Sequence, residues 1–237
     1  IIAGPNGAGK STLMQVLDGK RRPSGGMVRL GTGARPSIFA QQQNRLGQGR
    51  VIDVIWNKYP RMTELEVRSH LAKLGFRGET VFKPCEALSG GELARLRFAE
   101  IVLERPNLLF LDEPTAALDP ATTAAIHRLL REMNDGGTTI FLTTHNMEEA
   151  DRLCARVAFL NEGRIAETGV PAQLKLKYAK DRVRVLLEDG EALECARNPE
   201  AIGALLADLS GRGIASVHSE EPDLEEIFLQ VTGRNLV

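Results

Sequence analysis

Eight residues near the start of the chain have the types and spacing of a phosphate-binding loop. Gly4 to Ser11 reads GPNGAGKS, which fits the pattern G-x-x-x-x-G-K-[ST] at every fixed position, between an apolar stretch and a helical pattern. Glycines let the backbone wrap closely around phosphate oxygens, and the first N–H groups of a helix attract an anion. The Lys10 ammonium can reach the β- and γ-phosphates, and the Ser11 hydroxyl can bind Mg²⁺. The residues expected to bind ATP here are Gly4, Pro5, Asn6, Gly7, Ala8, Gly9, Lys10, Ser11 and Thr12.

Two carboxylates further along the chain could supply the metal and acid–base chemistry that such a loop needs. Asp112 and Glu113 follow the apolar run LLFL, which fits a strand covered on both faces of a parallel sheet. Ligands of such sheets bind at the carboxyl ends of the strands. Asp112 is therefore expected to hold Mg²⁺ through water, and Glu113 to polarise the attacking water as a general base. His145 ends the next apolar stretch, TIFLTT, and is expected at the same edge.

A second candidate anion site lies in the middle of the chain. The stretch CEALSGGELARLRFAE places Ser89, Gly90 and Gly91 directly before a helical pattern. Backbone N–H groups at such a start can hold an oxygen-rich anion. Because the chain already has a better phosphate loop at its beginning, the question is whose phosphate this second site binds.

The elements that must position these residues alternate along the chain. Strands are expected at residues 1–3, 27–31, 37–40, 107–112, 138–145 and 156–160, with an antiparallel return over 165–169. A mainly helical region covers residues 44–105, and further helices are expected over 121–133 and 146–155. Strands that alternate with helices predict an α/β fold with a mainly parallel sheet. Together with the phosphate loop, this pattern indicates a P-loop NTPase with a helical subdomain.

The character of the chain changes near residue 180. A hairpin is predicted around Asp189 and Gly190, followed by a helix, a strand and a last helix that ends near Gly233. We therefore expect a nucleotide-binding domain over residues 1–179, with its helical subdomain at about 44–105, and a small α/β appendage over 180–237. A structural cap or a dimer contact is the simplest role for the appendage.

Composition excludes several classes of protein. The 237 residues are 43% hydrophobic and 26% charged, as in an ordinary globular protein. Thirty basic and thirty-one acidic residues give a net charge of -1, so there is no overall attraction to nucleic acid or anionic lipid. No stretch approaches the roughly 20 apolar residues of a membrane-spanning helix. The widely spaced cysteines predict free thiols in a reducing compartment, hence a cytoplasmic protein; they are Cys85, Cys154 and Cys195.

Five motifs follow one another in an order that resembles the nucleotide-binding domain of an ATP-binding cassette (ABC) ATPase. They are the P-loop at 4–11, LSGGE at 88–92, LLFLDEP at 108–114, ALD at 117–119 and TTH at 143–145. The resemblance covers residues 1 to about 179. In that family two such domains pack head to tail, and each ATP lies between the P-loop of one and the signature sequence of the other. The resemblance therefore implies that Ser89, Gly90 and Gly91 cap a γ-phosphate held by Lys10 of a neighbouring domain.

Further residues take their expected roles from the same resemblance. Gln41 matches the glutamine that contacts Mg²⁺ or the attacking water, and Gln42 and Gln43 follow it directly, so neighbouring registers stay open. Asp119 matches the loop that spans the dimer, and His145 matches the switch histidine at the γ-phosphate. The aromatic side chain that stacks on adenine lies upstream of the P-loop in the family. This chain begins after that position, so weak nucleotide binding is expected.

Two kinds of ABC protein remain open. The stretch after His145 resembles bacterial exporter ATPases that drive efflux of drugs, lipids or polymers, and their C-terminal extensions often end like PDLEEIFLQVTGRNL. This resemblance implies a dimer beneath an integral-membrane permease, at the cytoplasmic face of the membrane. Residues 66–115 and the stretch FAQQQ resemble the ABC-F group instead, soluble paired-cassette ATPases that act on the ribosome. The single P-loop and the absence of a charged linker favour the exporter, with ABC-F as the alternative; DNA is not an expected partner.

Overall fold

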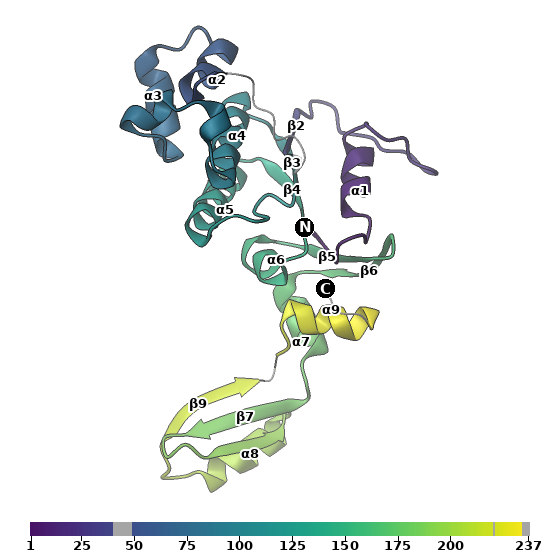
Figure 1. Ribbon diagram of the computed structural model, residues 1–237. Coiled ribbons are helices and arrows are strands. Elements are labelled where there is room, and N and C mark those ends of the chain that lie inside the picture. The colour runs from purple at the N-terminus through teal and green to yellow at the C-terminus, as the bar shows by residue number, and fades with distance from the viewer. Residues whose placement is uncertain (40–48, 220, 234–237) are drawn as a thin grey trace.

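The structure, a computed structural model, describes residues 1–39, 49–219 and 221–233. Its larger domain is built on a six-stranded sheet with the order β2-β3-β4-β1-β5-β6 (Figure 1). Neighbouring strands are parallel except β5 and β6, which are antiparallel. The predicted α/β fold with a mainly parallel sheet is therefore confirmed. The strands are β1 (Ile2–Ala3), β2 (Pro36–Phe39), β3 (Leu108–Asp112), β4 (Thr139–Thr144), β5 (Val157–Asn161) and β6 (Arg164–Gly169).

The unbroken apolar run of β3 suits its interior position in the sheet. It pairs with β2 on one edge and β4 on the other, so its backbone hydrogen bonds are satisfied on both sides. Leu109 and Leu111 are fully buried and pack with α4 (Gly90–Glu104) and α5 (Pro120–Asp135). Helix α1 (Lys10–Leu17) lies against the sheet on the opposite side (Figure 1). The strand is thus covered on both faces, and it delivers Asp112 to the carboxyl edge.

The helical region has a core of its own. It contains α2 (Val51–Lys58), α3 (Glu64–Lys73), short 3₁₀ helices at Gly78–Phe82 and Cys85–Ala87, and α4. The side chain of Thr63 caps α3, and Glu66 bonds back to the backbone N–H of Thr63. The buried residues of this core are Val51, Ile52, Ile55, Val67, Leu71, Phe76, Val81, Cys85, Leu96 and Ala99. The core packs α2 and α3 on one face of α4 through Leu96 and Ala99, while another face of α4 packs with the sheet.

Two short segments differ from the expected elements. Residues 27–31 do not form the strand that their pattern predicts, and Met27 is 87% exposed. A strand needs the N–H and C=O groups of a neighbour, and no strand in the described part of the chain pairs with this segment. Conversely, Pro171–Tyr178 forms a helix, α7, that the sequence analysis missed. Pro171 occupies the first helical turn, where its fixed φ and missing N–H are tolerated.

A small lobe follows α7. Its three strands form an antiparallel sheet of order β8-β7-β9, and one helix packs on that sheet. The alternation in RVRVLL is typical of a half-buried strand: Val183, Val185 and Leu187 are buried, whereas the residues between them are exposed. Figure 1 shows the lobe extending away from the larger domain. Its elements are β7 (Arg182–Leu187), β8 (Ala192–Ala196), α8 (Pro199–Asp208) and β9 (Ile214–Ser219).

The last helix, α9 (Leu224–Thr232), does not belong to this lobe. Its place in the chain predicts that it belongs to the appendage over 180–237, but its apolar side chains pack on the larger domain beside α6 (Met147–Leu153) and α7 (Figure 1). Phe228 is fully buried, and its ring meets that of Phe159 on β5 edge to face at 5.6 Å. The apolar stripe of α9 therefore completes a core of the larger domain, which the amphipathic pattern alone could not assign.

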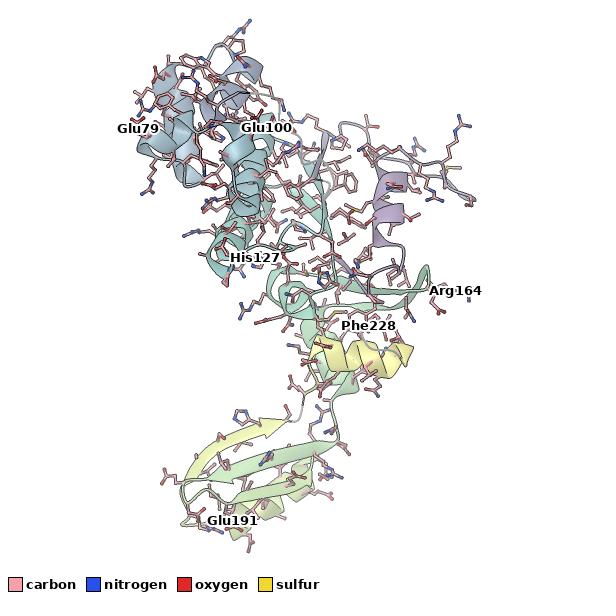
Figure 2. All side chains as sticks on the ribbon, viewed as in Figure 1. Glu79, Glu100, His127, Arg164, Glu191 and Phe228 are labelled. Atoms are coloured by element: carbon pink, nitrogen blue, oxygen red, sulfur yellow. The ribbon has the colours of Figure 1, made fainter. Side chains whose placement is uncertain are left out.

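Truncation of Phe228 is expected to destabilise the larger domain rather than the small lobe. Figure 2 labels Phe228 on the side of α9 that faces the larger domain. Because the side chain is 0% exposed, Phe228→Ala should lower the free energy of unfolding by about 3–5 kcal/mol. Leu229, which is 44% exposed on the same helix, is the matched control. Leu229→Ala should change the free energy of unfolding by less than about 1 kcal/mol. Urea unfolding measures both, and equal losses would show that α9 is not anchored through Phe228.

Candidate active site

The P-loop connects β1 to α1 and lies at the carboxyl edge of the sheet. The N–H of Gly4 donates to the carbonyl of Thr144 at 3.1 Å, which joins the start of the loop to the end of β4. A Cβ atom at Gly4 would lie 2.2 Å from the carbonyl oxygen of Leu160, so only glycine fits there. Gly9, the N-cap of α1, has a φ of 106°, a left-handed conformation that other residues rarely adopt. The motif's glycines are therefore required by the course of the backbone.

Lys10 lies inside the loop and is 5% exposed. Its ammonium donates hydrogen bonds to the carbonyls of Gly4 at 2.7 Å and Pro5 at 3.1 Å. It also forms an ion pair with Glu113, with 3.0 Å between Nζ and Oε1. The lysine of the phosphate loop and the proposed general base therefore contact each other directly.

Glu113 is also in contact with His145. The Nδ1 atom of His145 lies 2.7 Å from Oε2 of Glu113, and since a carboxylate only accepts, the ring donates. Glu113 is 8% exposed and has a φ of 49°, where the chain turns sharply after β3. Its backbone N–H still pairs with the carbonyl of Thr143 at 3.1 Å, which fixes the turn to β4. The Glu113 carboxylate, which follows β3, therefore contacts Lys10 from the segment after β1 and His145 from the segment after β4.

Asp112 is oriented by a neighbouring strand. It is 9% exposed, and the hydroxyl of Thr143 donates to its Oδ1 at 2.6 Å. That bond uses one of the two carboxylate oxygens. Ser11 lies in the first turn of α1 and is exposed. A hydroxyl and a carboxylate are hard oxygen donors, and Mg²⁺ in proteins is usually held by one or two such groups together with phosphates, so these residues fit a magnesium ion.

The second candidate anion site is the start of α4. Ser89 is the N-cap, its hydroxyl accepts from the N–H of Glu92, and the Glu92 carboxylate accepts the N–H of Ser89 at 2.8 Å. A hydrogen bond from the Lys83 ammonium also lowers the pKa of Glu92. Gly90 and Gly91 are the first two helical residues, whose N–H groups have no acceptor within a helix. Ser89 and Gly90 are exposed, so these N–H groups can reach an external anion.

Asp119 lies beside this helix start. It is the N-cap of α5, and its Oδ1 accepts the N–H of Thr122 at 2.9 Å. Hydrogen bonding to Thr122 lowers the pKa of Asp119. A Cβ atom at Gly91 would lie 3.3 Å from Oδ2 of Asp119 and 3.2 Å from the Thr122 hydroxyl, so glycine allows the two helix starts to approach. The start of α4 and the start of α5 therefore form one surface.

The predicted site residues consequently fall into two groups. Lys10, Glu113 and His145 are in direct contact, with Asp112 preceding Glu113 in the chain. The helix start at 89–91 and Asp119 form the second group. Among the described residues, no hydrogen bond or ion pair connects 89–91 with the P-loop. Gln41 lies outside the described residues.

One buried carboxylate near the site was not predicted. Glu149, on α6, is 4% exposed and contacts both Thr115 and His127 through its Oε1. These partners are 34 and 22 residues away in the chain. No local pattern marks Glu149, because it stands in an ordinary acidic first helical turn.

Known proteins with similar sequences identify the family. A family model described as ABC transporter matches residues 1–116. A fluoroquinolones export ATP-binding protein of Mycobacterium tuberculosis is 35% identical over 256 residues, covering 99% of this chain and 83% of that protein. The chain belongs to the ABC transporter family. The motif order that predicted this family is thereby confirmed, and as an ABC protein the chain is an ATP-binding ATPase.

Two further matches agree with this assignment of an ABC protein. A daunorubicin resistance ATP-binding protein of Streptomyces coeruleorubidus is 30% identical, over 98% of this chain and 86% of that protein. The solved structure of cbiO1 from Clostridium perfringens, part of the ABC transporter complex cbiONQ, shares 29% identity with a TM-score of 0.58 over 73% of this chain and 77% of that one. The fluoroquinolones and daunorubicin relatives, which match nearly the whole chain, are named for export or resistance, and nothing in the matches favours the ABC-F alternative. No helix in the described part of the chain is long and apolar enough to cross a membrane.

Proposed function

We propose that this ABC protein is the ATP-hydrolysing subunit of an exporter, and that two copies close head to tail around ATP beneath a membrane permease. The observation that carries the proposal is the division of the site into two groups. The start of α4 offers exposed N–H groups but no phosphate-binding lysine, while the P-loop has Lys10, Glu113 and His145 in contact. Each group is half of a phosphate site, and a second copy supplies the missing half.

The residues of the P-loop group have the chemistry for binding Mg²⁺-ATP. Backbone N–H groups of the loop after Pro5, up to Thr12, bind the phosphates, and the ammonium of Lys10 neutralises their charge. Ser11 and Asp112 would hold Mg²⁺, which would neutralise negative charge on the phosphates when bound. Gln41 remains a candidate for the same ion or for the attacking water.

Hydrolysis requires the ion pair between Lys10 and Glu113 to open. A γ-phosphate carries more negative charge than one carboxylate, so it competes for the Lys10 ammonium. Oε1 of Glu113 is then free to accept a proton from water, whose oxygen attacks the γ-phosphorus while the bond to the ADP oxygen breaks. His145 orients the carboxylate through Oε2, and its Nε2 atom is the candidate contact with the γ-phosphate. Opening and closing of this pair links phosphate binding to activation of the base.

The names of the relatives support a membrane permease as the transport partner and the membrane surface as the location. Proteins that match this chain over nearly its full length are named for export of fluoroquinolones or resistance to daunorubicin. We infer a permease as the partner and the cytoplasmic face of the membrane as the location. The stretch 45–82, of which the structure describes residues 49–82, is the candidate contact with the permease.

Isolation of the protein with its partner tests this proposal. The tagged protein, purified from detergent-solubilised membranes of its source cells, should retain an integral-membrane protein with several spanning helices, identified by mass spectrometry. Its ATPase rate should change when that partner is present. Co-sedimentation with ribosomes in the presence of a non-hydrolysable ATP analogue, without any membrane partner, would contradict the exporter and support the ABC-F alternative.

A further inference from the structure

Side chains from two other segments meet at the buried carboxylate of Glu149, and the backbone of Glu149 is held by the N-cap of its own helix. Oε1 of Glu149 accepts the hydroxyl of Thr115 at 2.6 Å and the ring N–H of His127, through Nε2, at 2.9 Å. The backbone N–H of Glu149 is bound by the side chain of Asn146 at 3.0 Å. The three partners come from the loop after β3, from α5 and from the start of α6.

Each of these partners is close in the chain to a residue with a proposed role. Thr115 is two residues after Glu113, and Asn146 directly follows His145. His127 is on α5, whose N-cap is Asp119, and Figure 2 labels it where α5 approaches α6. A shift of Glu149 would therefore be transmitted over one or two residues to Glu113 and His145.

Burial makes this arrangement rigid. Glu149 is 4% exposed, and the side chain of His127 is 13% exposed. Burial alone raises the pKa of the Glu149 carboxyl, but the hydrogen bonds from His127 and Thr115 outweigh that effect, and its pKa is lowered. The carboxylate is therefore ionised at neutral pH, where it accepts two charge-assisted hydrogen bonds on one oxygen. Removing either donor leaves a buried charge less well satisfied.

We propose that Glu149 is a positioning residue for ATP hydrolysis, which holds Thr115 and the start of α6 so that Glu113 and His145 keep their 2.7 Å contact. The proposal rests on the roles proposed above for Glu113 and His145. Among the described residues, Glu149 makes no hydrogen bond to Glu113 or His145, so it acts through the two loops. Since the P-loop is not part of this network, nucleotide binding does not depend on it.

Replacement of Thr115 tests the proposal with little change of shape. Thr115→Val removes the hydroxyl that binds Glu149 and keeps the branched side chain, whereas Thr115→Ser, the matched control, keeps the hydroxyl. Thr115→Val should lower kcat by about tenfold to a hundredfold, because small misplacements of catalytic groups cost rates of that order. The KM for ATP should stay within about twofold, and Thr115→Ser should stay within about threefold of the parental kcat.

Two outcomes would overturn it. A purely structural role would lower the melting temperature of Thr115→Val and leave kcat at 20–25 °C unchanged. Equal loss of kcat in Thr115→Val and Thr115→Ser would show that the hydroxyl does not matter. If Thr115→Val does not fold, the hydrogen bond from His127 on α5 is tested instead. His127→Phe removes this donor and should lower kcat, whereas His127→Gln keeps a donor and should not.

The same series separates failure of this proposal from failure of the proposed function. In a Glu113→Gln background, Thr115→Val should cause a much smaller further loss, because the Glu113 carboxylate that it positions is gone. Full activity of Thr115→Val together with an inactive Glu113→Gln would refute the positioning role alone. Full activity of Glu113→Gln would refute the base, and with it the basis of the positioning role.

Discussion

Glu113→Gln is expected to lower the kcat for ATP hydrolysis by about 10²–10⁴-fold while ATP still binds. Glutamine cannot accept the proton of the attacking water, although it occupies the same space. The substitution also removes the ion pair with Lys10. Because the ammonium no longer has to leave a buried carboxylate before it meets a phosphate, ATP affinity should be equal to or higher than that of the parental protein.

A turnover assay and an ATP titration measure the two effects of Glu113→Gln, and size-exclusion chromatography with ATP measures a third. Since hydrolysis is what opens the dimer, the variant should accumulate as a closed dimer that the parental protein shows only briefly. Glu79→Gln, on the exposed 3₁₀ helix of the helical region, is the matched control and should behave as the parent does. Parental turnover in Glu113→Gln would rule out this carboxylate as the base.

Ser89→Arg is expected to abolish hydrolysis and ATP-dependent dimerisation while the fold persists. The long side chain would stand at the exposed start of α4, where the N–H groups of Gly90 and Gly91 must approach a phosphate closely. Loss of the serine cap should cost only about 1 kcal/mol of stability. Circular dichroism and the melting temperature check the fold, and Ser210→Arg, on an exposed turn of the small lobe, controls for the added charge and bulk.

Mixing two inactive variants decides whether the pocket is shared between copies. In a head-to-tail dimer of Lys10→Ala with Ser89→Arg, one pocket carries both defects and the other carries none. About half of the dimers in an equal mixture are of this kind, so up to about a quarter of the parental activity should return. A pocket built within one copy would give no recovery, because every copy is then defective.

The parts of the site that share a sheet edge could be predicted from the sequence, because parallel strands bring their carboxyl ends together. Apolar runs located β3 and β4, and the residues after them, Glu113 and His145, are in contact. Pairing of Lys10 with Glu113 could not be predicted, since it depends on the sharp turn that follows β3. The hydrogen bonds of Glu149 could not be predicted either, because the residues that form them come from three elements and none belongs to a motif.

Periodicity predicted helices and strands better than it predicted their partners. The amphipathic pattern of α9 was clear, but a stripe of apolar residues does not say which surface it covers. Nearness in the chain suggested the small lobe, whereas Phe228 packs against Phe159 on β5. Residues 27–31 show the opposite failure: their pattern suits a strand, yet strand formation depends on a neighbour that local sequence does not specify.

The return of α9 to the larger domain changes what kind of attachment the small lobe is. It enters through α7 and leaves through α9, and both of these helices are packed in one core with β5. The lobe is therefore an insertion between two helices packed on the larger domain, not a terminal extension. A segment inserted between two fixed ends can be lengthened, exchanged or removed without disturbing the core. Ending the chain after α7 would instead remove α9 and expose Phe159. The small lobe can therefore change in length or sequence while α9 keeps its contacts with the larger domain.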